Sequence, residues 1–155
     1  MGIEIERKFL VKGDRWRPLG TGELYRQGYL TAAKDGCTVR VRVAGDRGYL
    51  TVKGKTVGNQ RSEFEYQIPV AEAEEMLNTL CRQPQIEKTR YKIPLGSLVW
   101  EVDEFAGENA GLIVAEVELS DPEQAIDLPE WIDQEVSTDP RYFNAYLAQV
   151  PFQRW

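Results

Sequence analysis

The chain has 155 residues, a formal net charge of −6 from 25 acidic and 19 basic side chains, and no histidine. This acidic balance disfavours general binding to nucleic acid or to a membrane surface, since both need a broad basic field. Without histidine there is no histidine-based catalytic triad or histidine-ligated zinc site, so acid–base chemistry would fall to carboxylates, lysine, tyrosine or metal-bound water.

The length and the hydrophobic content of 42% predict one globular domain over residues 1–155. No apolar run approaches the roughly 18 residues of a membrane-spanning helix, and the opening Met1-Gly2-Ile3-Glu4 lacks the pattern of a signal peptide. The two cysteines, Cys37 and Cys81, lack metal-site spacing. We therefore expect a cytoplasmic protein in a reducing compartment.

The first predicted strand, residues 3–9, already shows the pattern that organises the chain. Side chains of a strand alternate between two faces, so Glu4, Glu6 and Lys8 share one face and apolar residues occupy the other. One such strand also fits an ordinary sheet whose charges meet water. The recurrence of the pattern along the chain is what gives it weight.

Four further strands are predicted at residues 24–32, 37–44, 49–55 and 61–68. Lys34-Asp35-Gly36 predicts a turn after the first of these, and residues 45–48 predict a hairpin after the second. The charged faces of the last three strands carry Arg40, Arg42, Lys53, Lys55, Glu63 and Glu65.

The second half begins with helical apolar spacing at residues 70–80, which predicts a helix lying on an apolar surface. Strands follow at residues 85–93, 98–105 and 112–119. Two Asp-Pro pairs, at 121–122 and 139–140, predict helix starts, the first of a short helix and the second of a helix over 141–150. The charged faces of these strands carry Lys88, Arg90, Glu101, Asp103, Glu116 and Glu118.

Eight strands joined by short turns predict a closed antiparallel β-barrel. Either the apolar faces fill the barrel, or the charges line a tunnel and the apolar exterior lies beneath helices. We favour the tunnel because the helices need an apolar sheet surface and because few uncharged polar residues dilute the charged faces. The predicted fold is therefore α+β, an eight-stranded antiparallel β-barrel tunnel with a charged interior and helices packed outside.

A charged interior needs an occupant, because buried charges without partners are costly. Basic side chains on one wall would bind an anionic chain, and acidic ones on another would hold Mg²⁺ or Mn²⁺, which take oxygen ligands. A linear triphosphate fits best, since it is narrow, highly charged and naturally metal-bound.

The opening Glu4-x-Glu6-x-Lys8 resembles the signature of the CYTH superfamily, the triphosphate tunnel metalloenzymes. The charged pairs of the later strands, the segment 27–30 and the helix predicted from Arg141 follow the order of that family, so the resemblance covers nearly the whole chain. It implies an eight-stranded tunnel that hydrolyses or transfers triphosphate groups with a divalent metal, and a C-terminal plug helix that closes one tunnel end.

The resemblance also implies roles for single residues. Lys88 and Tyr29 resemble a pair that orients or protonates groups in compact bacterial members, and we expect them to act in catalysis with Glu4 and Glu6. The expected substrate-binding residues are Lys8, Arg40, Arg42, Lys53, Lys55 and Arg90. The expected metal ligands are Glu4, Glu6, Glu63, Glu65, Glu116, Glu118 and Asp103. A structural ion pair is the alternative for each of them.

The compact chain resembles bacterial tripolyphosphatases, so we expect metal-dependent hydrolysis of inorganic triphosphate to pyrophosphate and phosphate. The expected partner is a small-molecule triphosphate, with no nucleic acid and no membrane; a homodimer is an open option. The alternatives are an adenylate cyclase or a thiamine or nucleoside triphosphatase of the same fold, and a non-catalytic polyphosphate-binding module. The retained acids favour an enzyme over the module, and the sequence shows no nucleoside pocket for a cyclase.

Overall fold

The computed structural model describes residues 2–32 and 36–155, so most of the turn expected at Lys34-Asp35-Gly36 lies outside the described residues. The strands are β1 (Ile3–Val11), β2 (Gly22–Ala32), β3 (Thr38–Ala44), β4 (Arg47–Lys53), β5 (Gln60–Ile68), β6 (Ile86–Leu95), β7 (Leu98–Phe105), β8 (Ile113–Glu118) and β9 (Ile132–Glu135). The α-helices are α1 (Val70–Thr79) and α2 (Asn144–Leu147), and single 3₁₀ turns lie at Arg17–Leu19, Gly107–Asn109, Pro140–Tyr142 and Phe152–Arg154.

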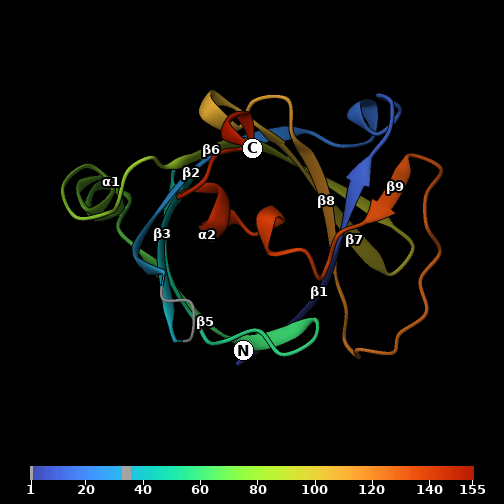
Figure 1. The fold of residues 1–155 in the computed structure, drawn as a ribbon, viewed down its shortest axis with the longest axis horizontal. Helices are drawn as coiled ribbons and strands as arrows, with labels where there is room; N and C mark the ends of the chain where they lie inside the picture. Colours follow the sequence, from blue (N-terminus) through green and yellow to red (C-terminus); the bar gives the residue numbers. More distant parts are fainter. Residues whose placement is uncertain (1, 33–35) are drawn as a thin grey trace.

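Strands β1 to β8 form a closed antiparallel barrel in the order β5-β4-β3-β2-β6-β7-β8-β1 (Figure 1). The ring closes where the first residues of β1 pair with β5, with Ile3 opposite Ser62. Further along β1 the short strand β9 is added, with Phe9 opposite Glu135. The predicted eight-stranded barrel is thus confirmed, with β9 as an additional strand.

The exterior of the barrel is apolar and carries the core of the protein. On the side of β1, β6, β7 and β8, Phe9, Trp100 and Val117 pack with Trp131, and the ring centroids of Trp100 and Trp131 lie 5.8 Å apart. This surface is covered by β9 and by the connecting segments, not by helices as predicted, because the segments themselves supply Trp16 and Trp131.

Helix α1 covers the exterior of β3 and β4, as its apolar stripe predicted (Figure 1). Ala73 and Leu77 of the helix pack on Val41 and Leu50. The contact is close because β4 presents Gly48 to the helix, where an added Cβ would come within 2.8 Å of Ala73 Cβ.

Two helix predictions need correction. Residues after Asp121-Pro122 form a single turn and then a segment without regular structure, in which Pro129 disfavours helical geometry at Leu128. The helix predicted over 141–150 is a 3₁₀ turn followed by the four-residue α2, because Phe143 between them is extended, with φ −74° and ψ 136°.

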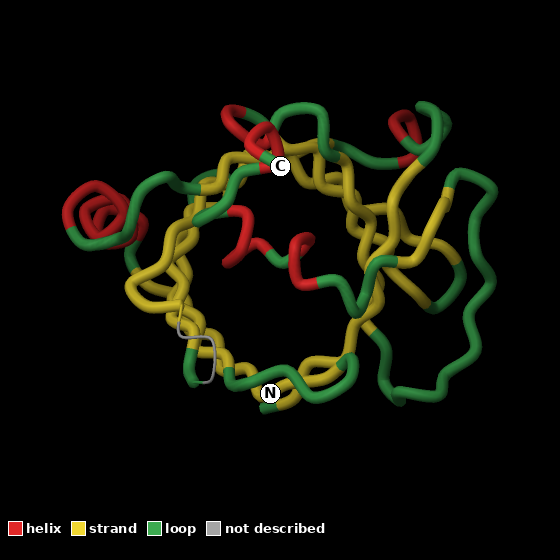
Figure 2. The backbone as a smooth tube through the Cα atoms, in the orientation of Figure 1, coloured by secondary structure: helices red, strands yellow, loops and turns green. Residues whose placement is uncertain are grey.

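The C-terminal segment nevertheless takes the predicted place of the plug. Helix α2 and the turn before it lie inside the ring of strands (Figures 1 and 2). Leu147 of α2 is fully buried against Ile86, Phe105 and Val114. These three strand residues continue the inward-facing positions of their strands, so the inner wall is apolar where the plug packs and charged beyond it.

Among the described residues, no helix has the length and apolar character needed to cross a membrane.

Candidate active site

The barrel encloses a cavity of about 510 Å³ to which every strand of the ring contributes. Its lining includes most of the predicted site residues, namely Glu4, Glu6, Lys8, Tyr29, Arg40, Arg42, Lys53, Glu63, Glu65, Arg90, Glu116 and Glu118. Of the other three, Lys55 is exposed beyond the end of β4 and does not line the cavity. Lys88 and Asp103 are buried in the wall behind it. The charged faces therefore point inward, as the tunnel arrangement predicted.

The two guanidinium groups of β3 are only partly paired: Arg40 has one acidic partner and Arg42 has none among the described residues. Arg40 donates through Nη2 to Thr51 Oγ1 and Glu65 Oε2, each at 3.2 Å, but its Nε is buried without a partner among the described residues. Arg42 donates to Gln27 Oε1 at 2.8 Å, and no described carboxylate lies within ion-pair distance of it. Burial, and after it Arg40 and Arg90, lower the pKa of Arg42 to about 9. This part of the cavity is built to receive an anion.

Arg90 and Lys88 instead share the carboxylate of Asp103, and Arg90 also lies 3.3 Å from both Glu101 and Glu116. Asp103 accepts from Arg90 Nε at 2.7 Å and Nη2 at 2.8 Å, and from Lys88 Nζ at 2.7 Å. Burial, with Arg90 and Arg42, lowers the pKa of Lys88 to about 7 although Asp103 opposes the shift. Burial alone would raise the pKa of Asp103, but Arg90 and Lys88 hold it well below its usual range. Both Asp103 oxygens are thus occupied by cations.

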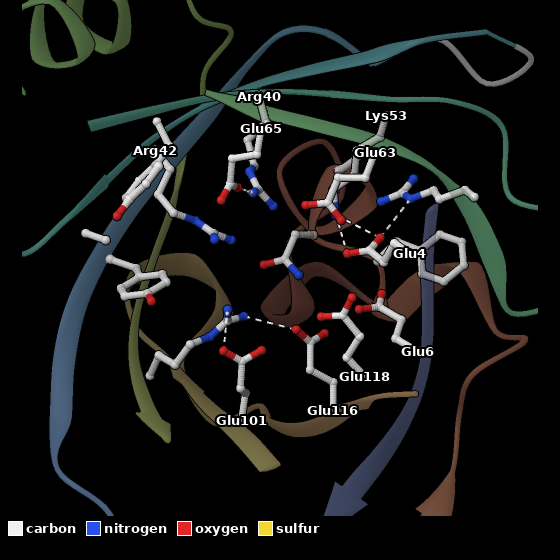
Figure 3. Close-up of a pocket in the computed structure, with 18 of the residues that line it drawn as sticks. Glu4, Glu6, Arg40, Arg42, Lys53, Glu63, Glu65, Glu101, Glu116 and Glu118 are labelled. Atoms are coloured by element: carbon white, nitrogen blue, oxygen red, sulfur yellow. Dashed lines mark hydrogen bonds and ion pairs between the residues drawn. The ribbon is translucent and has the colours of Figure 1, made fainter. Parts of the chain in front are cut away.

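Carboxylates gather on the side of the cavity formed by β1 and β8, across from Arg40 and Arg42 (Figure 3). Burial and the neighbouring Glu116 raise the pKa of Glu6 to about 7. Lys8 Nζ lies 3.9 Å from a carboxylate oxygen of Glu6 and of Glu116, which is at the limit of an ion pair. Within the described part of the chain, no three acidic side chains already converge as a metal site.

Glu4 is the well-paired acid of this group. It lies 3.1 Å from Lys53 and 3.4 Å from Arg61. Burial raises its pKa, but Lys53, a hydrogen bond from Glu63 and Arg61 together lower it to about 2. The same hydrogen bond, after burial, raises the pKa of Glu63 to about 7, so Glu63 shares a proton with Glu4.

Sequence analysis missed several residues of the cavity. Arg61 shares the inward face of β5 with two predicted acids, so period-two spacing could have found it. Tyr25 lies between two cations, with its ring centroid 4.8 Å from the Arg42 guanidinium and 5.0 Å from that of Arg90. Phe143 and Asn144 enter from the plug, where no strand periodicity could reveal them.

A closed barrel whose cavity is lined by many basic side chains and many carboxylates is typical of a tunnel that binds a charged polyanion. The CYTH domain family matches residues 2–144, and the chain belongs to that family. This confirms the resemblance seen in the sequence.

Two relatives named inorganic triphosphatase match along nearly their whole lengths. The one from Acetivibrio thermocellus is 53% identical over 155 residues, which are 100% of this chain and 99% of the relative. The one from Nitrosomonas europaea is 42% identical over 153 residues, covering 94% of this chain and 96% of the relative. A crystal structure of an inorganic triphosphatase has a TM-score of 0.64 and 36% identity, covering 94% of this chain and 93% of that one.

Proposed function

We propose that this protein hydrolyses inorganic triphosphate to pyrophosphate and phosphate with the help of a divalent metal ion. One observation carries the proposal: Arg40 and Arg42 are buried in the wall of an enclosed cavity, and the Nε of Arg40 has no partner among the described residues. A charge-dense anion would supply the missing acceptors. The names of the two relatives support a triphosphate as that anion.

The basic side chains would bind the phosphate oxygens. Arginine is suited to this because its planar guanidinium donates two parallel hydrogen bonds to one phosphate group. The substrate-binding set is Lys8, Arg40, Arg42, Lys53 and Arg90, all of which line the cavity. Lys55 is left out of this set because it lies outside the cavity.

The carboxylates facing them fit Mg²⁺ or Mn²⁺, which prefer oxygen ligands. The fit rests on geometry: these carboxylates line the cavity, and Lys8 approaches Glu6 and Glu116 no closer than 3.9 Å. The pKa values of Glu6 and Glu63, raised first by burial, agree with this. The residues that would hold the ion or ions are Glu4, Glu6, Glu63, Glu65, Glu116 and Glu118. Such an ion polarises phosphate oxygens and lowers the pKa of bound water. Both oxygens of Asp103 already accept hydrogen bonds from Arg90 and Lys88. We therefore propose that Asp103 positions these two side chains and is not a metal ligand.

The chain's own residues would do the remaining work of the reaction. The arginines hold the triphosphate in a fixed place and stabilise negative charge that develops on its oxygens. Lys88, with a pKa of about 7, is suited to giving or taking a proton near neutrality. Tyr29 lines the same end of the cavity, and its hydroxyl accepts from Gln27 Nε2 at 3.4 Å. The plug excludes bulk water from this end.

The test is a substrate panel with purified protein and Mg²⁺ or Mn²⁺. Inorganic triphosphate, ATP and thiamine triphosphate are supplied separately, and phosphate, pyrophosphate and cyclic AMP are measured. We expect equal amounts of phosphate and pyrophosphate from inorganic triphosphate, and no release in EDTA. Cyclic AMP from ATP, without release of phosphate from triphosphate, would overturn the proposal. We place the enzyme in the cytoplasm, with a small-molecule substrate and no nucleic-acid or membrane partner, and a homodimer as an option.

A further inference from the structure

The hydrogen bonds around Asn144 determine which way its carboxamide faces. Asn144 is the first residue of α2 and lines the cavity. Its Oδ1 accepts from Lys88 Nζ at 3.0 Å and from Gln27 Nε2 at 3.4 Å. In its charged form, which the 2.7 Å contact with the Asp103 carboxylate favours, Lys88 only donates, so the oxygen of Asn144 faces it.

The orientation of Gln27 is fixed in the same way. Its Oε1 accepts from Arg42 Nε at 2.8 Å, and a guanidinium also only donates. Gln27 therefore has to turn its amide nitrogen toward Asn144, which again requires the oxygen of Asn144 on that side. Two independent donors thus set one orientation of the plug residue.

This leaves the amide nitrogen of Asn144 facing away from both donors. Among the described residues, Asn144 Nδ2 donates no hydrogen bond. Its neighbours Lys88 and Gln27 both donate to its oxygen, and the residue lines the cavity. This N–H group is therefore available to an acceptor that enters the cavity.

We propose that Asn144 contacts the substrate, with Nδ2 donating a hydrogen bond to a phosphate oxygen of bound triphosphate. This inference rests on the proposed function. The C-terminal plug then belongs to the binding site, besides closing one end of the barrel. Leu147, three residues further on, anchors the plug by packing on the apolar part of the inner wall, independently of the side chain of Asn144.

Two substitutions separate the donor from the acceptor. Asn144→Ala removes both. Asn144→Asp keeps an oxygen for Lys88 and replaces the donor by a second carboxylate oxygen, which repels phosphate. The matched control is Asn78→Asp on α1, because Asn78 Oδ1 also accepts from a cation, Arg26 Nη2 at 2.7 Å, but on the outside of the barrel.

The measurement is the dissociation constant of inorganic triphosphate by calorimetry in EDTA, followed by KM and kcat with Mg²⁺. Loss of a hydrogen bond to a charged group weakens binding by about tenfold or more, so we expect that increase in the dissociation constant and KM for Asn144→Ala. Asn144→Asp should bind more weakly still. Asn78→Asp should match the unmodified protein.

An unchanged dissociation constant in folded Asn144→Ala overturns the inference, whatever Asn144→Asp does. If the alanine variant does not fold, Asn144→Leu, which also lacks the donor and the acceptor, is judged by the same criterion. The outcome is separable from the proposed function. If the unmodified protein binds triphosphate without hydrolysing it, the hydrolase proposal fails, while the binding comparison still decides the role of Asn144.

Discussion

Arg42 and Arg90 are buried in the same cavity but differ in what holds them. Arg90 donates to Asp103 through Nε and Nη2 and to Glu101 through Nη1, whereas Arg42 has only the neutral Gln27. A buried charge without an acid partner lowers the stability of the fold unless a ligand neutralises it. At Arg42, the charge that would bind an anion lowers the stability of the ligand-free fold. At Arg90, the charge that would bind an anion also stabilises the fold through its acid partners.

This difference predicts opposite effects of one substitution at the two sites. Arg42→Gln keeps an amide donor for Gln27 and removes an uncompensated charge, so the free energy of unfolding should stay equal or rise. Arg90→Gln leaves Asp103 short of a partner and should lower it by on the order of 3 kcal/mol. Both should weaken triphosphate binding at least about tenfold.

Urea unfolding without ligand and calorimetric titration with triphosphate measure the two quantities. A large loss of stability in Arg42→Gln would show that this guanidinium has a structural role, contrary to its assignment as an anion-binding group.

Glu4 and Glu6 form a second contrasting pair. Gln in place of Glu6 resembles the protonated acid, so Glu6→Gln should fold at least as stably as the unmodified protein at pH 8. Glu4→Gln leaves Lys53 without its ion pair and should unfold more readily. Both should lose metal-dependent phosphate release by at least about tenfold, since both remove a proposed metal ligand. Full activity in either folded variant would contradict the metal role of that residue.

Single residues also show where sequence reasoning reached its limit. Inward-facing charges followed from alternation along each strand, because a strand fixes the direction of every second side chain. Lys55 was misplaced since β4 ends at Lys53 and alternation stops with the strand. Asn144 carried no signal, because its position depends on how the last segment folds back into the barrel.

At the scale of elements, the strands and α1 were predictable and the C-terminal segment was not. Hairpins such as β3–β4 follow from a glycine in the turn, Gly45 with φ +59°, between two alternating runs. Strand β9 has four residues and α2 has four, too few for a periodic pattern to stand out. Their structure is set by the tertiary surface on which they pack, not by local preference.

The plug yields a prediction that belongs to this scale. Leu147 is fully buried against the apolar part of the inner wall, so Leu147→Ala should cost about 2 to 5 kcal/mol of unfolding free energy. The control is Leu80→Ala, because Leu80 directly follows α1 and its side chain is exposed. Denaturant unfolding followed by tryptophan fluorescence measures both. Equal stabilities of the two variants would show that the plug is not anchored through Leu147.

For the whole molecule, the interior of the barrel is organised around a charged occupant. The apolar surface that usually fills a small barrel lies outside, against α1 and the connecting segments. Enclosing these charges costs folding free energy, and a ligand that pairs with them would reduce this cost. The stability of the protein should therefore depend on what fills the cavity, and on pH.

The sign of the pH dependence follows from three buried groups. Glu6 and Glu63 have pKa values raised from 4.5 to about 7, so the folded state holds more protons than the unfolded state between these values. Their contribution to stability is present at low pH and is lost as the pH rises through that window. The pKa of Lys88 is lowered from 10.5 to about 7, so its contribution increases as the pH rises from 7 toward 10.5. Within the window from about pH 5 to pH 10, above the range in which Glu4 and Asp103 become protonated, the metal-free protein should be least stable near neutral pH.

A divalent cation should bind to Glu6 and Glu63 at pH values at which these two acids have lost their protons. At pH 5.5 protons already neutralise these acids and compete with the ion, whereas at pH 8 the carboxylates are free to bind it. We expect Mg²⁺ to raise the unfolding temperature clearly more at pH 8 than at pH 5.5, as measured by calorimetry at fixed ionic strength. Glu6→Gln should reduce this difference, because one of the two proton-binding acids is gone. An equal effect of Mg²⁺ at both pH values would mean that the ion binds elsewhere on the protein.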